Sequence, residues 1–143
     1  MVPSILVVDD DMGDIQLVHR ALSALTYDAT LYAVQSVELA AQFLEGQDAF
    51  AGMPRPDLVV LDLHLPGASG YDVLSLMRSD ERWRAIPIVV LSSSSRPSDI
   101  EYCSRLGAIS YYVKPTTWDE YLAMARSFKG FWVTGQHPAS AQT

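Results

Sequence analysis

Residues 4–11 of the chain read Ser4-Ile5-Leu6-Val7-Val8-Asp9-Asp10-Asp11. The apolar part of this run is continuous instead of alternating, which is typical of a strand covered on both faces of a parallel sheet. The acidic residues follow at the carboxyl end of that strand, the end at which open α/β sheets bind their ligands. This run therefore predicts an α/β fold and also the edge of the sheet where a site would lie.

The rest of the chain continues the alternation of strand and helix that this run begins. Short apolar runs rich in β-branched residues recur at residues 29–34, 58–61, 88–91 and 111–113. Apolar residues at helical spacing occur at residues 13–25, 37–44, 71–78, 97–105 and 117–132. Such alternation implies right-handed crossovers and one parallel sheet with helices on both faces. Residues 46–56, which hold two prolines and two glycines, are expected to form a loop.

Length and composition restrict the class of protein. The 143 residues are enough for one domain with a substantial core, which we expect at residues 1–134, followed by a disordered tail at residues 135–143. The formal net charge of −7 argues against binding nucleic acid or anionic membrane surfaces. No apolar run approaches the roughly 20 residues of a membrane span, and no signal peptide is apparent. Because Cys103 is the single cysteine, no internal disulfide can form, and a reducing cytoplasm is the expected compartment.

Polar residues also end three of the later apolar runs. Asp62, Ser92 and Lys114 directly follow the third, fourth and fifth runs. If the strands lie in the order 2-1-3-4-5, the first and third strands are neighbours, and Asp9 and Asp10 lie beside Asp62. Taken singly, each motif is more often a solvated helix start or a turn. Their conjunction at corresponding ends of four strands predicts a shared pocket.

The chemistry of such a pocket is restricted. Carboxylates a few ångströms apart must bind protons or share a cation, and ligands that are all oxygen suit Mg²⁺ or Mn²⁺. A lysine opposite them supplies a point charge for a phosphate group. An aspartate can itself be the nucleophile and form an aspartyl phosphate, while metal and lysine neutralise the oxygens of the transferring group.

In the order of these motifs the sequence resembles the receiver domains of bacterial two-component systems. The matching stretches are Ile5-Leu6-Val7-Val8-Asp9-Asp10, Leu61-Asp62-Leu63-His64-Leu65-Pro66, Val90-Leu91-Ser92 and Val113-Lys114-Pro115. With the helices between them, they cover residues 4–132. The resemblance implies a flavodoxin-like (βα)5 fold, a doubly wound five-stranded parallel sheet in the order 2-1-3-4-5. It also implies a signalling protein that catalyses its own phosphorylation and autodephosphorylation.

The resemblance implies roles for individual residues. Asp62 would accept a phosphoryl group from a histidine of a partner kinase. Mg²⁺, with Mn²⁺ as an alternative, would be held by the carboxylates of Asp10 and Asp62. Asp9 would contribute mostly through water, and His64 through its backbone carbonyl. Asp11 lies one place beyond the acidic pair and is left out of the site.

Three further residues would act on the phosphoryl group. Lys114 would hold one phosphoryl oxygen, and the hydroxyl of Ser92 would turn toward the group. Tyr111 matches the aromatic switch position of the family and would rotate inward after Ser92 moves. The bond between Lys114 and Pro115 is expected to be cis, as it is in the family, so that it aims the lysine into the pocket.

Within the family, the chain is similar to small regulators that work with phytochrome-type histidine kinases and lack an output domain. Those proteins carry an insertion before the third strand, here residues 46–56, and a last helix that ends in aromatics, here Phe131 and Trp132. His64 departs from the Asn that is frequent in that group. We expect a homodimer built on the fourth strand, the fifth strand and the last helix, or on that helix's end. The reason is that Phe131 and Trp132 should lie exposed beyond the sheet.

Three other interpretations stay open from the sequence. An aspartyl-phosphate phosphatase of the haloacid dehalogenase type would need a strand-ending Asp-x-Asp, whereas the second position here is His64. A flavin-binding electron carrier would need a phosphate loop rich in Ser, Thr and Gly, whereas three aspartates repel a phosphate. A degenerate receiver acting as an adaptor would not need the intact set of polar strand ends. The sequence names neither the kinase, nor the signal, nor the target.

Overall fold

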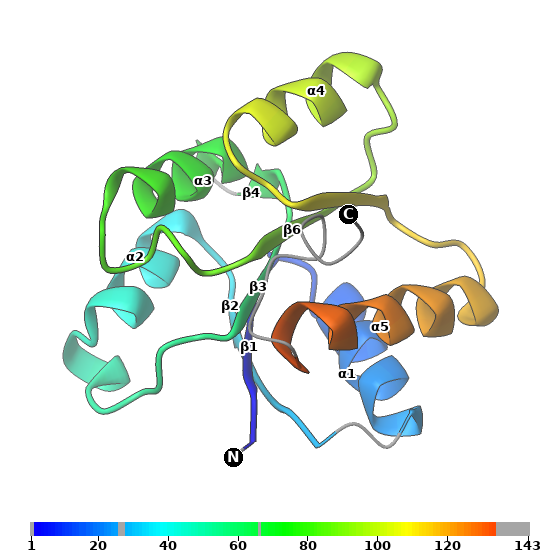
Figure 1. Ribbon diagram of the computed structural model, residues 1–143, viewed down its shortest axis with the longest axis horizontal. Helices are drawn as coiled ribbons and strands as arrows, with labels where there is room; N and C mark the ends of the chain where they lie inside the picture. Colours follow the sequence, from blue (N-terminus) through cyan, green and yellow to red (C-terminus); the bar gives the residue numbers. More distant parts are fainter. Residues whose placement is uncertain (1, 26–27, 66, 134–143) are drawn as a thin grey trace.

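The computed structural model describes residues 2–25, 28–65 and 67–133, except for the side chains of residues 132 and 133 (Figure 1). Parallel strands form one sheet in the order β2-β1-β3-β6-β7. These strands are β1 (Ser4–Val8), β2 (Thr30–Val34), β3 (Leu58–Leu61), β6 (Ile88–Ser92) and β7 (Ser110–Val113). Counted along the chain the order is 2-1-3-4-5, so the predicted topology is confirmed. The tail expected at residues 135–143 lies outside the described residues.

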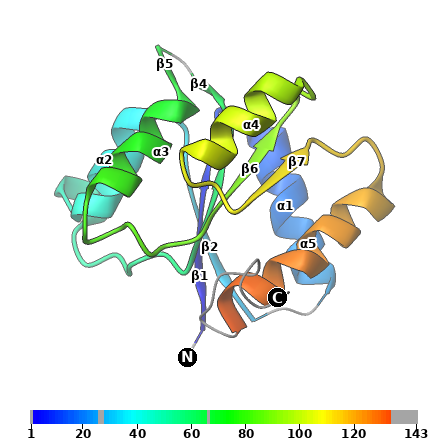
Figure 2. The same cartoon turned by 45° about the horizontal axis from the view of Figure 1, so that its top comes forward.

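Helices cover both faces of this sheet. They are α1 (Met12–Ala24), α2 (Val37–Glu45), α3 (Gly70–Ser79), α4 (Pro97–Arg105) and α5 (Trp118–Val133). Figures 1 and 2 show α1 and α5 together on one face and α2, α3 and α4 on the other. No described helix has the length and apolar character needed to cross a bilayer.

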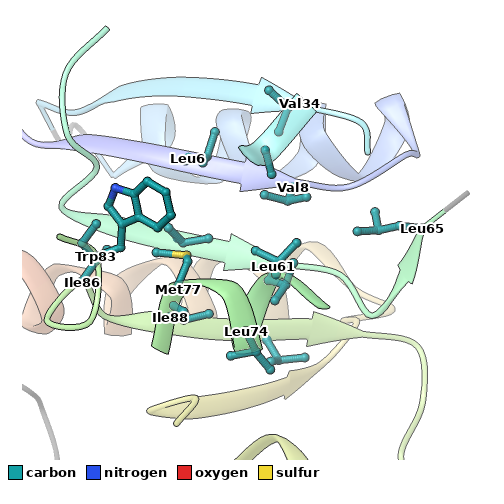
Figure 3. Close-up of a cluster of buried hydrophobic side chains, with 14 of the residues drawn as sticks. Leu6, Val8, Val34, Leu61, Leu65, Leu74, Met77, Trp83, Ile86 and Ile88 are labelled. Atoms are coloured by element: carbon teal, nitrogen blue, oxygen red, sulfur yellow. The ribbon is translucent and has the colours of Figure 1, made fainter. Parts of the chain in front are cut away.

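Two buried apolar clusters fill the space between the sheet and its helices. Figure 3 shows the cluster on the α3 side, where Leu74 and Met77 of α3 lie over Leu61 of β3. The other cluster lies under α1 and α5. Successive residues of a strand point to opposite faces, so Leu6 belongs to the first cluster and Ile5 to the second. This double burial is the physical reason that β1 is apolar throughout.

The end of α5 differs from the expectation that its aromatics lie exposed. Phe131 is only 5% exposed, and its ring centroid lies 6.4 Å from that of Phe128. It shares a buried cluster with Ile5 of β1, because α5 runs back along the sheet and its last turn still covers apolar surface. The argument for a dimer from an exposed Phe131 is therefore wrong. The side chain of Trp132 lies outside the described part of the chain.

Two short elements lie where the sequence shows no periodic pattern. The loop predicted at residues 46–56 is confirmed in outline but includes a 3-10 turn, η1 (Asp48–Phe50), whose Phe50 ring lies 5.4 Å from that of Phe43. A small antiparallel hairpin pairs β4 (His64–Leu65) with β5 (Ala68–Ser69). Strands of two residues are too short to give an alternating pattern. The hairpin leads from β3 into α3 and borders the carboxyl edge of the sheet.

Arg78 of α3 ties several connections of the fold together. Its Nε and Nη2 donate to the carbonyl of Gly107 at 3.2 and 2.8 Å. Its Nη1 donates to the carbonyls of Arg84 and Ile86 at 2.8 and 3.1 Å. Gly107 has a φ of 101°, and a Cβ there would come within 2.5 Å of Nε of Arg78. Only glycine fits this approach, so the guanidinium holds α3 against the connections that precede β6 and β7.

Candidate functional site

Backbone hydrogen bonds beyond the strand ends bring the predicted residues to one edge of the sheet. The N–H of Asp9 donates to the last carbonyl of β2 at 3.1 Å, and that of Asp62 donates to the last carbonyl of β1 at 2.9 Å. On the other side, the N–H of Lys114 donates to the carbonyl of Ser92 at 2.8 Å. The pairing of neighbouring strands thus continues past their ends, and the four strand ends meet as predicted.

Asp9, Asp10 and Asp62 form an acidic cluster at this edge. One carboxylate oxygen from each lies within 4.8 Å of the others. Asp9 and Asp62 are 2% and 3% exposed, whereas Asp10 is exposed. Burial raises the pKa of Asp9 to about 7, in spite of the N–H of Asp11 and the charge of Lys114, which lower it. Two of these close carboxylates are almost fully buried, so leaving their charges uncompensated would be costly. Such a set of oxygens is suited to binding a hard divalent cation.

Both oxygens of the Asp62 carboxylate have a donor. Oδ1 accepts from the backbone N–H of His64 at 3.1 Å, and Oδ2 accepts from Nζ of Lys114 at 3.0 Å. Gly70, the first residue of α3, packs on the same strand end. A Cβ at that position would overlap the carbonyl oxygen of Asp62 and lie 2.8 Å from Cα of Leu63. The orientation and the backbone of Asp62 are therefore both fixed by their surroundings.

Lys114 lies among carboxylates. Its Nζ is 2.6 Å from Oδ2 of Asp14, 3.0 Å from Oδ2 of Asp62 and 3.4 Å from Oδ2 of Asp9. Burial alone would lower the pKa of Lys114, but the hydrogen bonds to Asp14 and Asp62 and the charge of Asp9 outweigh it and raise the pKa. Lys114 therefore carries a positive charge against the acidic cluster at neutral pH.

Asp14 is a part of this site that the sequence did not reveal. It lies in the first turn of α1, where acidic residues are common because their negative charge interacts favourably with the helix dipole. Its distance from Asp10 along the chain gives no signal, because Asp10 precedes the N-cap of α1 and the partner of Asp14 is the distant Lys114. Asp11, which was left out of the site, caps α1 instead, and its Oδ1 accepts from the N–H groups of Gly13 and Asp14 at 2.8 and 3.3 Å.

A chain of hydrogen bonds leads from Ser92 toward α3 and α4. The buried Ser92 hydroxyl accepts from the N–H of Ser94 at 3.1 Å, which leaves its own proton for another acceptor. The carbonyl of Ser94 accepts from the hydroxyl of Tyr111 at 2.7 Å. The side-chain hydroxyl of Ser94 donates to Asp99. Asp99 also accepts from the hydroxyl of Tyr71 at 2.7 Å. The predicted switch residue Tyr111 is thus connected to Ser92 through one residue.

A pocket opens beside this network and next to the acidic cluster. It has a volume of about 480 Å³. Its lining comes from the hairpin, α3 and the start of α4, together with Asp10. Its lining includes the basic residues His64 and Arg96 beside the acidic Asp10 and Asp99. The pocket therefore borders the acidic cluster at its exposed member, Asp10.

The Lys114–Pro115 bond is trans, as are all described peptide bonds, so the prediction of a cis bond is wrong. The lysine side chain already reaches Asp62 and Asp14 from the ordinary isomer. A cis bond is therefore not required to aim it, and trans is the more stable form of most X-Pro bonds.

The sequence matches a protein-family model described as the response regulator receiver domain, over residues 5–126. The chain belongs to this receiver family. Membership decides against the phosphatase and the flavin carrier, which are different families. In this receiver, the acidic pair Asp9 and Asp10 follows β1, Asp62 follows β3 and Lys114 follows β7, as the sequence order predicted.

Relatives of this receiver include phytochrome-associated regulators. Response regulator Rcp1 of Synechocystis is 31% identical over 129 residues, which cover 90% of this chain and 88% of Rcp1. The phosphorylated cyanobacterial phytochrome response regulator RcpA superposes with a TM-score of 0.86 at 30% identity, covering 95% of this chain and 97% of RcpA. The Mn²⁺-bound form of Rcp1 superposes with a TM-score of 0.81 at 31% identity, covering 91% and 94% of the two chains.

Proposed function

We propose that this receiver accepts a phosphoryl group on Asp62 and thereby switches a surface that another protein recognises. The observation that carries the proposal is the environment of Asp62. Its carboxylate is 3% exposed, accepts hydrogen bonds from Lys114 and from the N–H of His64, and lies within a cluster of further carboxylates. A nucleophile oriented in this way, beside a fixed cation, is suited to phosphoryl transfer, where positioning and charge neutralisation supply most of the catalysis.

The cation in this proposal is Mg²⁺, with Mn²⁺ as an alternative. The carboxylates of Asp10 and Asp62 would hold it, with Asp9 acting mostly through water and His64 through its backbone carbonyl. The all-oxygen donor set supports this choice, and so does the similarity to Rcp1, which has been solved in a Mn²⁺-bound form. When bound, the ion neutralises charge on the phosphoryl oxygens.

In the transfer, a bond forms between a carboxylate oxygen of Asp62 and phosphorus, while the bond from phosphorus to the donor nitrogen breaks. Lys114 moves from the carboxylate to a phosphoryl oxygen, and the free hydroxyl proton of Ser92 is donated to another. Later, water attacks the phosphorus, the bond from phosphorus to the Asp62 oxygen breaks, and inorganic phosphate leaves with the carboxylate restored, which is the autodephosphorylation expected of a receiver. The Ser92 hydroxyl accepts a hydrogen bond from the N–H of Ser94, so a movement of Ser92 would shift the backbone of Ser94. The carbonyl of Ser94, which accepts from the hydroxyl of Tyr111, would shift with it.

As donor we propose the phosphohistidine of a phytochrome-type histidine kinase. The support is the similarity to Rcp1 and to the phytochrome response regulator RcpA. The buried free thiol of Cys103 fits the reducing cytoplasm in which such a kinase would act.

We also propose a homodimer through the face formed by α4, β7 and α5. Phe131 does not support it, but one large apolar side chain on each of these elements lies exposed, namely Ile100 of α4, Val113 of β7 and Trp118 of α5. Exposed apolar groups on one face are typical of a protein interface. This face also carries Tyr111, so the proposed switch lies beside the proposed interface.

The test of the acceptor uses acetyl phosphate and Mg²⁺, with intact-protein mass spectrometry as the measurement. The parent should gain one phosphoryl group, and Asp62→Asn, which keeps the shape but lacks the nucleophilic oxygen, should gain none. Asp28→Asn is a matched control, since Asp28 is exposed and precedes β2 at the opposite edge of the sheet. Labelling of Asp62→Asn at the parental rate would refute the assignment. An unlabelled parent would favour an adaptor that works without phosphate.

A further inference from the structure

Asp14 differs from the other acidic residues of the pocket in what it contacts. Its carboxylate lies 2.6 Å from Nζ of Lys114, the shortest of the three ion pairs that the lysine makes. It is not one of the carboxylates that lie within 4.8 Å of one another in the acidic cluster. Both partners are sheltered, with the side chain of Lys114 18% exposed and that of Asp14 20% exposed. Asp14 therefore faces the lysine and not the cation site.

Lys114 cannot keep its present contacts during phosphoryl transfer. Its Nζ donates to Oδ2 of Asp62, so a lone pair of the proposed nucleophile is engaged by the ammonium group. Bond formation at that oxygen requires the ammonium to leave it and to follow the negative charge onto the phosphoryl oxygens. A lysine side chain released at this moment has several rotatable bonds and could turn toward solvent. An anchor on the far side of the ammonium prevents that loss.

We propose that Asp14 is the positioning residue that provides this anchor. It holds the ammonium group of Lys114 within the pocket while Lys114 exchanges Asp62 for a phosphoryl oxygen. The inference rests on the proposed function of Asp62. An acidic residue in the first turn of a helix could simply favour the helix dipole, but Asp11 already caps α1 and its charge serves that purpose. The short bond from Lys114 gives Asp14 a second, more specific partner.

The first test is the substitution Asp14→Asn, which keeps the shape and removes the charge. With saturating Mg²⁺ and acetyl phosphate, the initial rate of phosphorylation should fall about tenfold, as expected for the loss of one charge-assisted contact in the transition state. Asp11→Asn is the matched control, because it removes the same charge from the same helix start, keeps a capping side chain and does not contact Lys114. The rate of this control should stay within about twofold of the parent, since exposed charges are screened.

The second test separates positioning from metal binding and from general damage. Calorimetry should give Asp14→Asn a Mg²⁺ affinity within about threefold of the parent, whereas loss of a direct ligand weakens binding more than about tenfold. In a Lys114→Met background, Asp14→Asn should have no further effect on the slow residual phosphorylation, followed over hours by mass. A purely structural role would slow both backgrounds equally.

Three results would overturn the inference: a parental or faster rate in Asp14→Asn, a Mg²⁺ affinity that falls along with the rate, or an equal slowing in both backgrounds. A parent that gains no phosphoryl group would instead refute the proposed function. The failure of one proposal is therefore distinguishable from the failure of the other.

Discussion

Replacing Arg78 by Met should destabilise the fold strongly, although all the hydrogen bonds described for its guanidinium go to backbone carbonyls and none to a carboxylate. The substitution keeps most of the apolar stem and removes the donors that serve the carbonyls of Gly107, Arg84 and Ile86. An acceptor left without its partner costs about 1–3 kcal/mol when buried. The site is only half-buried, so water can reach some of the freed carbonyls, and the cost of desolvating the guanidinium is also relieved. At about 1 kcal/mol for each of the three carbonyls, the free energy of unfolding should fall by about 3 kcal/mol.

Urea unfolding followed by far-ultraviolet circular dichroism measures this change. The midpoint should fall with the slope of the transition unchanged, and Tm should fall by roughly 6–12 °C for a chain of this size. Arg105→Met is the control, because the side-chain contact of Arg105 within the described residues is an exposed i,i+4 pair with Glu101, and its loss should cost less than about 0.5 kcal/mol. If Arg78→Met were as stable as Arg105→Met, the guanidinium would not be holding these connections together.

Further predictions concern the site and the interface. Asp10→Ala should weaken Mg²⁺ binding more than tenfold, or by more than ~1.4 kcal/mol, because an anionic ligand is lost, and calorimetry with unchanged affinity would contradict this. Because burial raises the pKa of Asp9 from 3.8 to about 7, the metal-free folded state binds a proton that the unfolded state releases. Its stabilising effect is complete below pH 4 and is lost as the pH rises through 7, so the fall in Tm between pH 5.5 and 8 should be smaller in Asp9→Asn. By competition with that proton, Mg²⁺ should bind more tightly at pH 8 than at pH 6. Sedimentation of the parent protein should show a dimer at tens of micromolar. Val113→Asp changes a side chain on β7 that is 44% exposed, and this variant should be monomeric. A parent that is monomeric both with and without a phosphate mimic would refute the proposed dimer.

The sheet order and the position of the site were predictable because both depend on strong local patterns. A strand that is covered on both faces must be apolar throughout. The carboxylates of Asp9 and Asp62 therefore mark the ends of β1 and β3. Parallel strands then align these ends at one edge without further information. The short hairpin of β4 and β5 was not predictable, since strands of two residues are too short to give an alternating pattern.

Other features depend on distances between elements that are far apart in sequence. Asp14 becomes part of the site because α1 starts beside the end of β7, and its partner Lys114 lies 100 positions away. The burial of Phe131 depends on how far α5 reaches along the sheet. The trans form of the Lys114–Pro115 bond could not be read from the sequence, since the expectation of a cis bond came from the family resemblance alone.

Gly70 packs directly against the backbone of the proposed nucleophile Asp62 and has no side chain of its own. The carbonyl oxygen of Asp62 fills the volume that any side chain at position 70 would need. A methyl group there would displace the backbone that carries Asp62. The carboxylate, hydroxyl and ammonium groups of the pocket would all still be present. Position 70 is therefore a purely steric means of altering the reactivity of Asp62, and a protein engineer could use it to retune this receiver without changing its charge, its metal ligands or its hydrogen-bonding groups.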